Sequence, residues 1–338
     1  MPAVQVAATG RLFARGVIVK APDALERLAE VDTVVLDKTG TLTLGEPRLL
    51  DADACDATIL AQAAALATHS RHPYSRAIVR AARARGLTPG WLVNVREIPG
   101  SGLACETKDG AEDRLGSAGW VGVEPGAEDI AATLWYRRGD GPPFAFHFED
   151  SLRTDARDVI TSLRQAGFDV ELLSGDRPAA VKAAADAAGI ATWQAGIRPD
   201  GKIARLAALK ARGRKTLMIG DGLNDAPALA AGHASLSPSS AADISQTAAD
   251  AIFQGGRLAP VLESIAVSRR ARAMSLQNFA IALGYNALFV PLAVSGYVTP
   301  LIAALAMSAS SIVVTGNALR LRTMRLTLFG HASQEIRS

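Results

Sequence analysis

Apolar and polar positions follow one another along most of the chain in a pattern typical of an α/β protein. Short apolar runs that end in polar turns predict buried strands at 33–36 and 215–219, and the alternation of elements between them predicts a further strand at 169–173. Helical periodicity, closed in two cases by Gly167 and Gly189, predicts helices at 154–166, 178–188 and 200–211. Strands separated by helices favour a parallel sheet with helices on its faces.

Residues 46–146 are predicted to be a domain inserted into that sheet. The strand at 33–36 must join the strands that follow residue 150, so the chain leaves the sheet between them and returns. The first half of the insertion has helical periodicity at 56–67 and 74–85. Its second half has short strand-like runs between Gly and Pro turns, at 91–98, 102–108, 133–138 and 144–148. The inserted domain is therefore predicted to be α+β.

Charged residues are missing between Arg272 and Arg320. This interval holds two apolar segments, 278–298 and 300–319, each about as long as the roughly 20 residues that cross a bilayer. Arginines precede and follow the pair, so the positive-inside rule places both ends in the cytoplasm and the turn outside. The alternative is a buried helical hairpin of a soluble protein, which is disfavoured because such helices usually have a polar face.

Composition narrows the class of protein. Of the 338 residues, 49% are hydrophobic, which is enough for real cores and excludes a disordered chain. The net charge is only +3 and aromatic residues are not interleaved with the basic ones, so no nucleic-acid partner is expected. Cys55 and Cys105 form no CxxC pair, which argues against a disulfide framework and a thiolate metal module. We expect no signal peptide, because Arg11 and Arg15 interrupt the N-terminal apolar stretch.

Carboxylates follow two of the predicted strands. Asp37 ends the first, and Asp221 and Asp225 follow the strand at 215–219. Open α/β sheets bind ligands at the carboxyl ends of their strands, so we expect these groups to share one crevice. Asp37 could then accept a phosphoryl group, with Asp221, Asp225 and the backbone carbonyl of Thr39 as ligands of Mg²⁺.

Two further side chains extend this predicted site. The hydroxyl of Ser174, after the strand at 169–173, can donate to a phosphate oxygen, and Lys202 can neutralise another. Each alone is more often a cap or a solvated side chain, but their places at successive strand ends favour a common site. Thr39 stands where a phosphatase of this architecture needs an acid and base, so a persistent phosphoenzyme is favoured over simple hydrolysis.

The motifs D-K-T-G-T at 37–41 and G-D-G-L-N-D at 220–225, with the two apolar segments, resemble the catalytic half of a P-type ATPase. The resemblance covers residues 1–325 and implies a haloacid-dehalogenase-like, Rossmann-type phosphorylation domain, an inserted nucleotide-binding domain and a two-helix transmembrane hairpin, with ATP and Mg²⁺ as cofactors. It implies that Asp37 is phosphorylated and gives catalytic roles to Lys38, Thr39, Ser174, Gly175, Asp176, Lys202 and Asn224. Ser174 replaces the family's usual Thr and keeps its hydroxyl.

The same resemblance divides the chain into domains. It implies the end of a membrane helix or stalk at 1–22, a phosphorylation domain at 23–45 and 147–256, a nucleotide-binding domain at 46–146, a stalk and membrane pair at 257–325, and a tail at 326–338. Residues 150–153 resemble the hinge between the two catalytic domains, so Asp150 and Arg153 are counted with the cofactor-binding residues.

The segment at 70–73 resembles the His-Pro motif of the heavy-metal branch, in which the His, here His72 before Pro73, helps to position adenine. Gly100, Gly102 and Gly116 resemble glycines that let the backbone approach the nucleotide. Without the family context, such a His is most often a helix-start residue and a lone GxG a turn. Five residues before His72, where the branch often has a Glu near the adenine, this chain has Ala67, which predicts altered ATP affinity or selectivity.

Polar residues in the apolar segments suggest the cargo. Five residues of these segments resemble the intramembrane positions of copper(I) pumps: Tyr285, Asn286, Met307, Ser310 and Ser311. The thioether of Met307 suits Cu⁺, although such residues also serve packing between membrane helices. Several segments are most similar to the bacterial pumps associated with nitrogen-fixation operons and cbb3-type oxidase assembly, which implies a multi-pass protein of the bacterial inner membrane with cytoplasmic catalytic domains.

Two motifs of this branch, a Cys-Pro-Cys membrane helix and the Thr-Gly-Glu of an actuator domain, do not occur in the sequence. We therefore expect a truncated product or gene fragment that binds ATP and phosphorylates itself but does not transport alone. Its expected partner is the missing N-terminal half of a pump. Two alternatives stay open: a soluble phosphatase of the dehalogenase class, and a non-catalytic membrane partner or remnant.

Overall fold

The computed structural model describes residues 2–50, 52–106, 110–123, 132–221, 225–241 and 243–324. Its contacts divide the chain into two compact units, one made of Met1–Leu42 and Arg153–Ser338 and the other of Thr43–Leu152. The insertion expected at 46–146 lies inside the second unit. The second unit extends beyond the predicted insertion at both ends, because its first and last strands pair as far as Thr43 and Leu152.

A seven-stranded sheet is the core of the first unit, in the order β1-β13-β12-β11-β2-β9-β10. The strands are β1 (Val17–Val19), β2 (Thr33–Asp37), β9 (Asp169–Leu173), β10 (Thr192–Gln194), β11 (Thr216–Ile219), β12 (Ala234–Pro238) and β13 (Ala251–Phe253). All neighbours are parallel except β1 and β13. The three predicted strands are confirmed as β2, β9 and β11, which are adjacent in the middle of the sheet.

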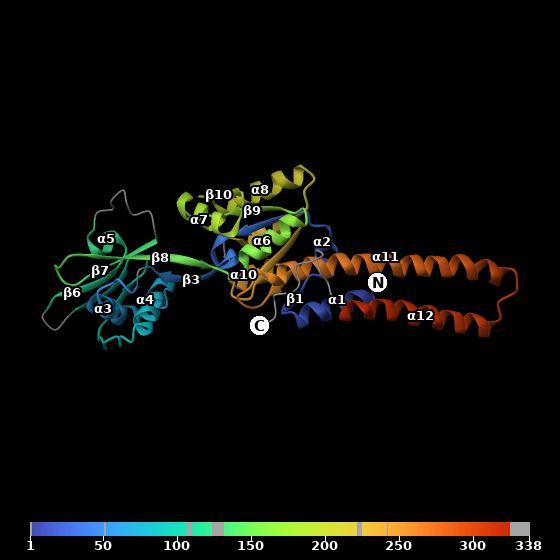
Figure 1. Cartoon of the computed structure of the whole chain (residues 1–338), viewed down its shortest axis with the longest axis horizontal. Helices are drawn as coiled ribbons and strands as arrows, with labels where there is room; N and C mark the ends of the chain where they lie inside the picture. Colours follow the sequence, from blue (N-terminus) through green and yellow to red (C-terminus); the bar gives the residue numbers. More distant parts are fainter. Residues whose placement is uncertain are drawn as a thin grey trace. The chain divides into compact units, whose positions relative to one another are not determined.

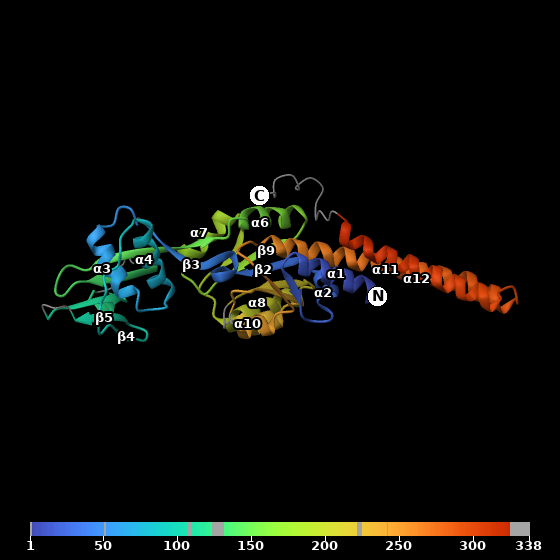
Figure 2. The same ribbon diagram turned by 90° about the horizontal axis from the view of Figure 1, so that it is seen from below.

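Helices cover both faces of this sheet. Figure 2 shows α6 on one side and α8 and α10 on the other. The helices around the sheet are α1 (Pro2–Ala14), α2 (Ala24–Glu30), α6 (Ala156–Gln165), α7 (Pro178–Ala188), α8 (Pro199–Ala211), α9 (Ala226–Ala231) and α10 (Asp243–Ala248). The predicted helices at 154–166, 178–188 and 200–211 are thus confirmed as α6, α7 and α8. Because both faces are covered, Val34, Val35 and Leu36 of β2 are all buried, as a central parallel strand requires.

Two long helices, α11 (Ala259–Val294) and α12 (Pro300–Thr323), run side by side (Figure 1). Both are long and apolar enough to cross a membrane. The first predicted span, 278–298, extends too far, because α11 ends at Val294 and the chain turns at Gly296 with a φ of 80°. Asp155 accepts hydrogen bonds from the backbone N of Leu258 (2.9 Å) and of Ala259 (2.8 Å), which fixes the first turn of α11 to the sheet-bearing part of the unit.

The N-terminal helix α1 packs against both of these helices. The guanidinium of Arg11 donates to the carbonyl oxygens of Leu321 (2.8 Å) and Met324 (2.6 Å), which end α12. Its other nitrogen lies 3.3 Å from Glu263 Oε1 on α11. The last carbonyls of a helix have no partner within it, so Arg11 caps α12 and ties the three helices together.

The second unit is a six-stranded antiparallel sheet in the order β3-β8-β7-β6-β5-β4. Its strands are β3 (Thr43–Leu49), β4 (Arg96–Ile98), β5 (Gly102–Glu106), β6 (Glu112–Gly116), β7 (Ala132–Arg137) and β8 (Phe144–Leu152). Its helices are α3 (Ala57–Ala67), α4 (Pro73–Ala84) and α5 (Ala118–Val121). The core lies between α3, α4 and one face of the sheet. The predicted helices are confirmed, whereas the strand predicted at 91–98 is wrong for 91–95, which are irregular.

Candidate functional site

The site expected from the sequence lies at the carboxyl edge of the parallel sheet. Asp37 is the last residue of β2 and is only 6% exposed. After Asp37 the chain forms a short irregular turn, η1 (Lys38–Leu42), in which Gly40 has a φ of 69°. This conformation suits glycine, and it also brings the backbone against a carboxylate, because a Cβ on Gly40 would overlap the side chain of Asp221.

Lys202, in the first turn of α8, joins two carboxylates. Its Nζ lies 2.6 Å from Asp37 Oδ1 and 2.6 Å from Asp225 Oδ1. All three side chains are buried. Burial alone would lower the pKa of Lys202, but the charges of Asp37 and Asp225 raise it, so the amine stays protonated. A buried ion pair of this kind depends on each partner, since the removal of one leaves an uncompensated charge.

Asp37 carries the most perturbed carboxyl group of this cluster. Burial and the nearby charge of Asp225 raise the pKa of Asp37 to about 6, against the opposing effect of Lys202. One cation therefore does not compensate for two buried carboxylates. Carboxyls with a raised pKa next to a specific charge partner are typical of functional sites.

The residues present fit a magnesium ion. Asp37, Asp221 and Asp225 each offer a carboxylate oxygen, and these atoms all lie within 4.8 Å of one another. Carboxylate oxygens are the ligands that Mg²⁺ prefers. The fully buried hydroxyl of Thr41 has no hydrogen-bond partner among the described residues. The sequence-based expectation that the three carboxylates share one place thus agrees with the structure, and their role as ligands stays a prediction.

The neighbouring strand β9 contributes the remaining polar groups. Leu173 pairs in register with Asp37, so Ser174 follows at the same edge and is buried. The backbone N of Asp176 donates to Ser174 Oγ at 3.2 Å, and the Asp176 carboxylate forms an ion pair with Lys38. Gly175 and the side chain of Thr39 are exposed. Asn224, predicted to be catalytic, lies outside the described residues.

Arg153 supports the turn after Asp37. Its guanidinium is 2% exposed and donates to the carbonyl oxygens of Gly40 (2.8 Å), Thr41 (2.7 Å) and Gly255 (2.8 Å). These three contacts give it a structural role, and no described contact directs it toward a ligand. The other predicted hinge residue, Asp150, accepts a hydrogen bond from the hydroxyl of Thr43 within the second unit.

The His-Pro segment and the glycines predicted to bind the nucleotide belong to the second unit, and Arg153 belongs to the first. His72 is the N-cap of α4, Pro73 is the first residue of that helix, and His72 Nδ1 accepts from the backbone N of Tyr74 at 3.4 Å. Ser70 Oγ accepts from the backbone N of His72 (3.1 Å) and donates to Glu97 Oε1 (2.6 Å). Glu97 belongs to β4, directly before the turn that holds Gly100 and leads to Gly102 at the start of β5. This contact therefore brings the His-Pro segment close to the turn before Gly102, and no motif in the sequence predicts it.

At two of the predicted glycines, the packing of the strands leaves no room for a side chain. Gly102 and Gly116 face each other across β5 and β6. A Cβ on Gly102 would overlap the carbonyl oxygen of Leu115, and one on Gly116 would overlap that of Ser101. Gly100 has a φ of 76° in the turn between β4 and β5. The close approach of the two backbones explains these residues without a ligand, so their contacts with a nucleotide stay a prediction.

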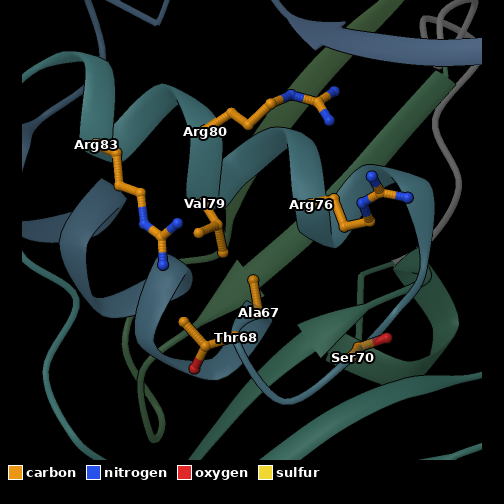
Figure 3. A pocket seen from close by; sticks show the side chains of 7 residues that line it. All are labelled: Ala67, Thr68, Ser70, Arg76, Val79, Arg80 and Arg83. Atoms are coloured by element: carbon orange, nitrogen blue, oxygen red, sulfur yellow. The ribbon is translucent and has the colours of Figure 1, made fainter.

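A pocket of about 260 Å³ opens beside Ser70 (Figure 3). It lies between α4 and the link from α3 to α4, and its lining residues are Ala67, Thr68, Ser70, Arg76, Val79, Arg80 and Arg83. Figure 3 shows Arg80 pointing away from Thr68 and Ser70, consistent with its hydrogen bond of 2.9 Å to the carbonyl of Pro47. The guanidinium groups therefore do not converge on one point in this pocket.

The polar residues predicted to meet the cargo lie on the two long helices. Tyr285 stacks on Phe289 at 4.7 Å between ring centroids, and Met307 is 65% exposed. Within the described hairpin, no hydrogen bond joins Tyr285, Asn286, Met307, Ser310 or Ser311 to one another. The polar contacts that join the two helices lie elsewhere. Asn317 Nδ2 donates to Asn278 Oδ1 at 2.9 Å, and Asn278 Nδ2 donates to the carbonyl oxygen of Val314 at 3.3 Å. The role of the five predicted residues is therefore untested.

Comparisons with known proteins agree with this geometry. A family model described as haloacid dehalogenase-like hydrolase matches residues 31–233. The nitrogen fixation protein FixI of Rhizobium meliloti is 47% identical over 326 residues, which are 95% of this chain and 42% of that protein. The copper-exporting P-type ATPase of Bacillus subtilis is 35% identical over 340 residues, which are 96% of this chain and 42% of that protein.

A solved structure is similar over nearly the same range. The crystal structure of a zinc-transporting PIB-type ATPase in its E2.Pi state matches with a TM-score of 0.77 and 30% identity, over 95% of this chain and 55% of that one. The chain thus spans less than half the length of the two curated relatives above.

Proposed function

Because this chain belongs to the haloacid dehalogenase-like hydrolase family and is a homologue of the heavy-metal P-type ATPases, we propose that Asp37 accepts the γ-phosphoryl group of ATP. A carboxylate oxygen of Asp37 forms a bond to the γ-phosphorus while the bond from that phosphorus to the bridging oxygen breaks. The product is an aspartyl phosphate, and ADP leaves with the electron pair of the broken bond. The observation that carries this proposal is the buried carboxylate of Asp37, 2.6 Å from Lys202 and beside Asp221 and Asp225.

The residues around Asp37 have separable tasks in this step. Lys202 holds Asp37 in place and offsets negative charge on the transferred oxygens. Ser174 can donate its hydroxyl to one of those oxygens. Lys38, paired with Asp176, fixes the loop after β9 against the loop after β2. When bound by Asp37, Asp221 and Asp225, Mg²⁺ would neutralise the charge of the phosphoryl group.

Persistence of the phosphoenzyme follows from what stands next to Asp37. Thr39 has a hydroxyl, which is a poor acid or base near neutral pH, so water is not readily activated there. We therefore propose a covalent intermediate that accumulates, unlike that of a soluble phosphatase of the same family. The nucleotide is proposed to bind in the second unit, around His72, Gly100, Gly102 and Gly116.

The transported cation is proposed to be copper(I), in a protein of the bacterial inner membrane. Support comes from the soft thioether of Met307 and from relatives whose names specify copper. The chain matches 42% of the length of each of the first two relatives, so we assign to these residues the phosphoryl-transfer step and part of the membrane path. We propose that the remaining steps of the transport cycle need the further segments that the longer relatives contain.

The test is incubation of the detergent-solubilised chain with γ-labelled ATP and Mg²⁺. The expected result is a label that is stable in acid and released by hydroxylamine, as an acyl phosphate is. Asp37→Asn should abolish it, whereas Asp186→Asn should not, because Asp186 lies on the surface of α7, where it pairs with Lys182.

Two results would contradict the proposal. One is steady release of phosphate from small phosphomonoesters without a trapped label, which would indicate a phosphatase. The other is a complete lack of labelling by a folded chain that binds ATP, which would favour a non-catalytic membrane partner.

A further inference from the structure

The carboxylate of Glu97 lies beside the predicted nucleotide residues but belongs to none of the motifs. Its Oε1 accepts a hydrogen bond of 2.6 Å from Ser70 Oγ. The same Ser70 oxygen accepts from the backbone N of His72 at 3.1 Å, so a chain of two hydrogen bonds links Glu97 to the His-Pro segment. Within the described residues, Oε2 of Glu97 has no partner, and the side chain is exposed. One oxygen is thus held while the other is open to a ligand.

The strand register shows on which face of the sheet Glu97 stands. Glu97 is paired with Leu103, and Leu103 is paired with Leu115. Side chains directly opposite each other in an antiparallel ladder share a face. Leu103 and Leu115 belong to the core beneath α3 and α4. Glu97 therefore projects on the face that carries the link between these helices, where Ser70 also lines the pocket of Figure 3.

His72 supplies a hydrogen-bond donor at the same corner. Its Nδ1 accepts from the backbone N of Tyr74, so this nitrogen carries a lone pair. In a neutral imidazole the proton must then sit on Nε2, which becomes a donor. The corner thus offers a carboxylate acceptor from Glu97 and an N–H donor from His72.

The carboxylate of Glu97 and the N–H of His72 are complementary to the hydrogen-bonding groups of adenine, and the carboxylate would repel O6 of guanine. Adenine has an exocyclic amine that donates at N6 and ring nitrogens that accept, whereas guanine has an oxygen acceptor, O6, in place of the amine. A carboxylate can accept from N6 and repels O6. We propose that Glu97 is the residue that makes this site prefer adenine to guanine nucleotides, with the proposed nucleotide binding in the second unit as its premise.

The test compares ATP and GTP on the full chain in detergent. Binding is measured by calorimetry for the wild type and for Glu97→Gln, which keeps an acceptor for Ser70 and removes the charge. We expect the ratio of ATP to GTP affinity to fall about tenfold, as the loss of one hydrogen bond to a charged group predicts. Ser70→Ala, which frees Glu97 from its anchor, should lower the ratio by a smaller factor.

The control is Glu106→Gln, an exposed glutamate at the end of β5 in the same unit. It should leave the ratio unchanged. An equal loss of ATP and GTP affinity in Glu97→Gln would indicate a merely structural role and would overturn the inference.

The outcome also separates this inference from the proposed function. If the wild type binds ATP and labels Asp37, but Glu97→Gln has the wild-type ratio, the inference is wrong and the proposed function stands. If the folded wild type binds no nucleotide, both are wrong.

Discussion

Gly40 and Asp221 are in such close contact that the carboxylate of Asp221 occupies the place where a side chain on residue 40 would begin. Gly40 also has a φ of 69°, which other residues rarely adopt. Gly40→Ala should therefore displace Asp221 from the carboxylate cluster. We expect Mg²⁺ to raise the melting temperature of the wild type, and we expect Gly40→Ala to lose both this rise and the phosphoenzyme label.

Gly10→Ala is the matched control, because Gly10 lies in α1 with nothing near the position of an added Cβ. It should keep both the label and the response to Mg²⁺. Wild-type labelling of Gly40→Ala would show that Asp221 is not needed at its present position.

Asp37→Asn should make the metal-free protein more stable. The pKa of Asp37 is raised from 3.8 to about 6 in the fold, so the ionised carboxylate costs stability at a pH above 6. Removing that charge should raise the free energy of unfolding by about 1–3 kcal/mol at pH 7.5 in EDTA. The difference should shrink as the pH falls from 6 toward 4, because the wild-type carboxyl then takes up a proton. Denaturant unfolding at several pH values measures it, and a less stable Asp37→Asn in EDTA would contradict the cause assigned to the pKa.

Lys202→Met should have the opposite effect. It leaves the buried carboxylates of Asp37 and Asp225 without their shared cation, which costs about 3–5 kcal/mol of stability. Mg²⁺ should restore part of the loss, and labelling should disappear. Lys182→Met, which removes an exposed i,i+4 pair with Asp186, should change the stability by no more than about 0.5 kcal/mol. Equal losses of stability in the two variants would show that the buried contacts of Lys202 contribute no more than an exposed ion pair.

Arg153→Met should separate the two parts of the proposed reaction. The substitution leaves the carbonyls of Gly40, Thr41 and Gly255 without their buried donor, which should destabilise the chain by about 1–3 kcal/mol. Phosphorylation should fall because the turn after Asp37 is loosened, while ATP affinity should stay unchanged. Arg157→Met, at an exposed site on α6, is the control. A large loss of ATP affinity in Arg153→Met alone would restore the role in nucleotide binding that its motif implied.

The central strands could be predicted because their sequence is dominated by one physical requirement. β2 and β11 are covered on both faces, so their apolar runs end abruptly at polar turns. β9 contains the buried Glu171 but was predicted from its place between two helices. β1, β10 and β13 are three residues long and show no period. β6 is hidden for another reason: it reads Glu-Asp-Arg-Leu-Gly, yet its Asp113 is buried and accepts a hydrogen bond of 3.0 Å from the hydroxyl of Tyr136. A charged residue at a core position conceals the alternation of a strand.

The carboxylate site was predictable for the same reason as β2, since each of its members follows a strand of one parallel sheet. The hydrogen bond from Ser70 to Glu97 was not predictable from the sequence. Glu97 is an exposed glutamate in a three-residue strand, 27 residues from Ser70, and only the strand register shows that both lie on one face. Arg153 was assigned from its motif to the hinge, and its three carbonyl partners could be seen only in the folded chain.

The 36 residues of α11 form one continuous helix, with Pro291 inside it, whose base is held by the carboxylate of Asp155. At 1.5 Å per residue such a helix is about 54 Å long, so a swing of about 5° at its base moves the tip by about 5 Å. A small rotation at the base of α11 is in this way amplified into a displacement the size of a helical turn at its tip. Arg11 contacts α11 near this base and also holds the end of α12, so it couples α1 and α12 to the position of α11.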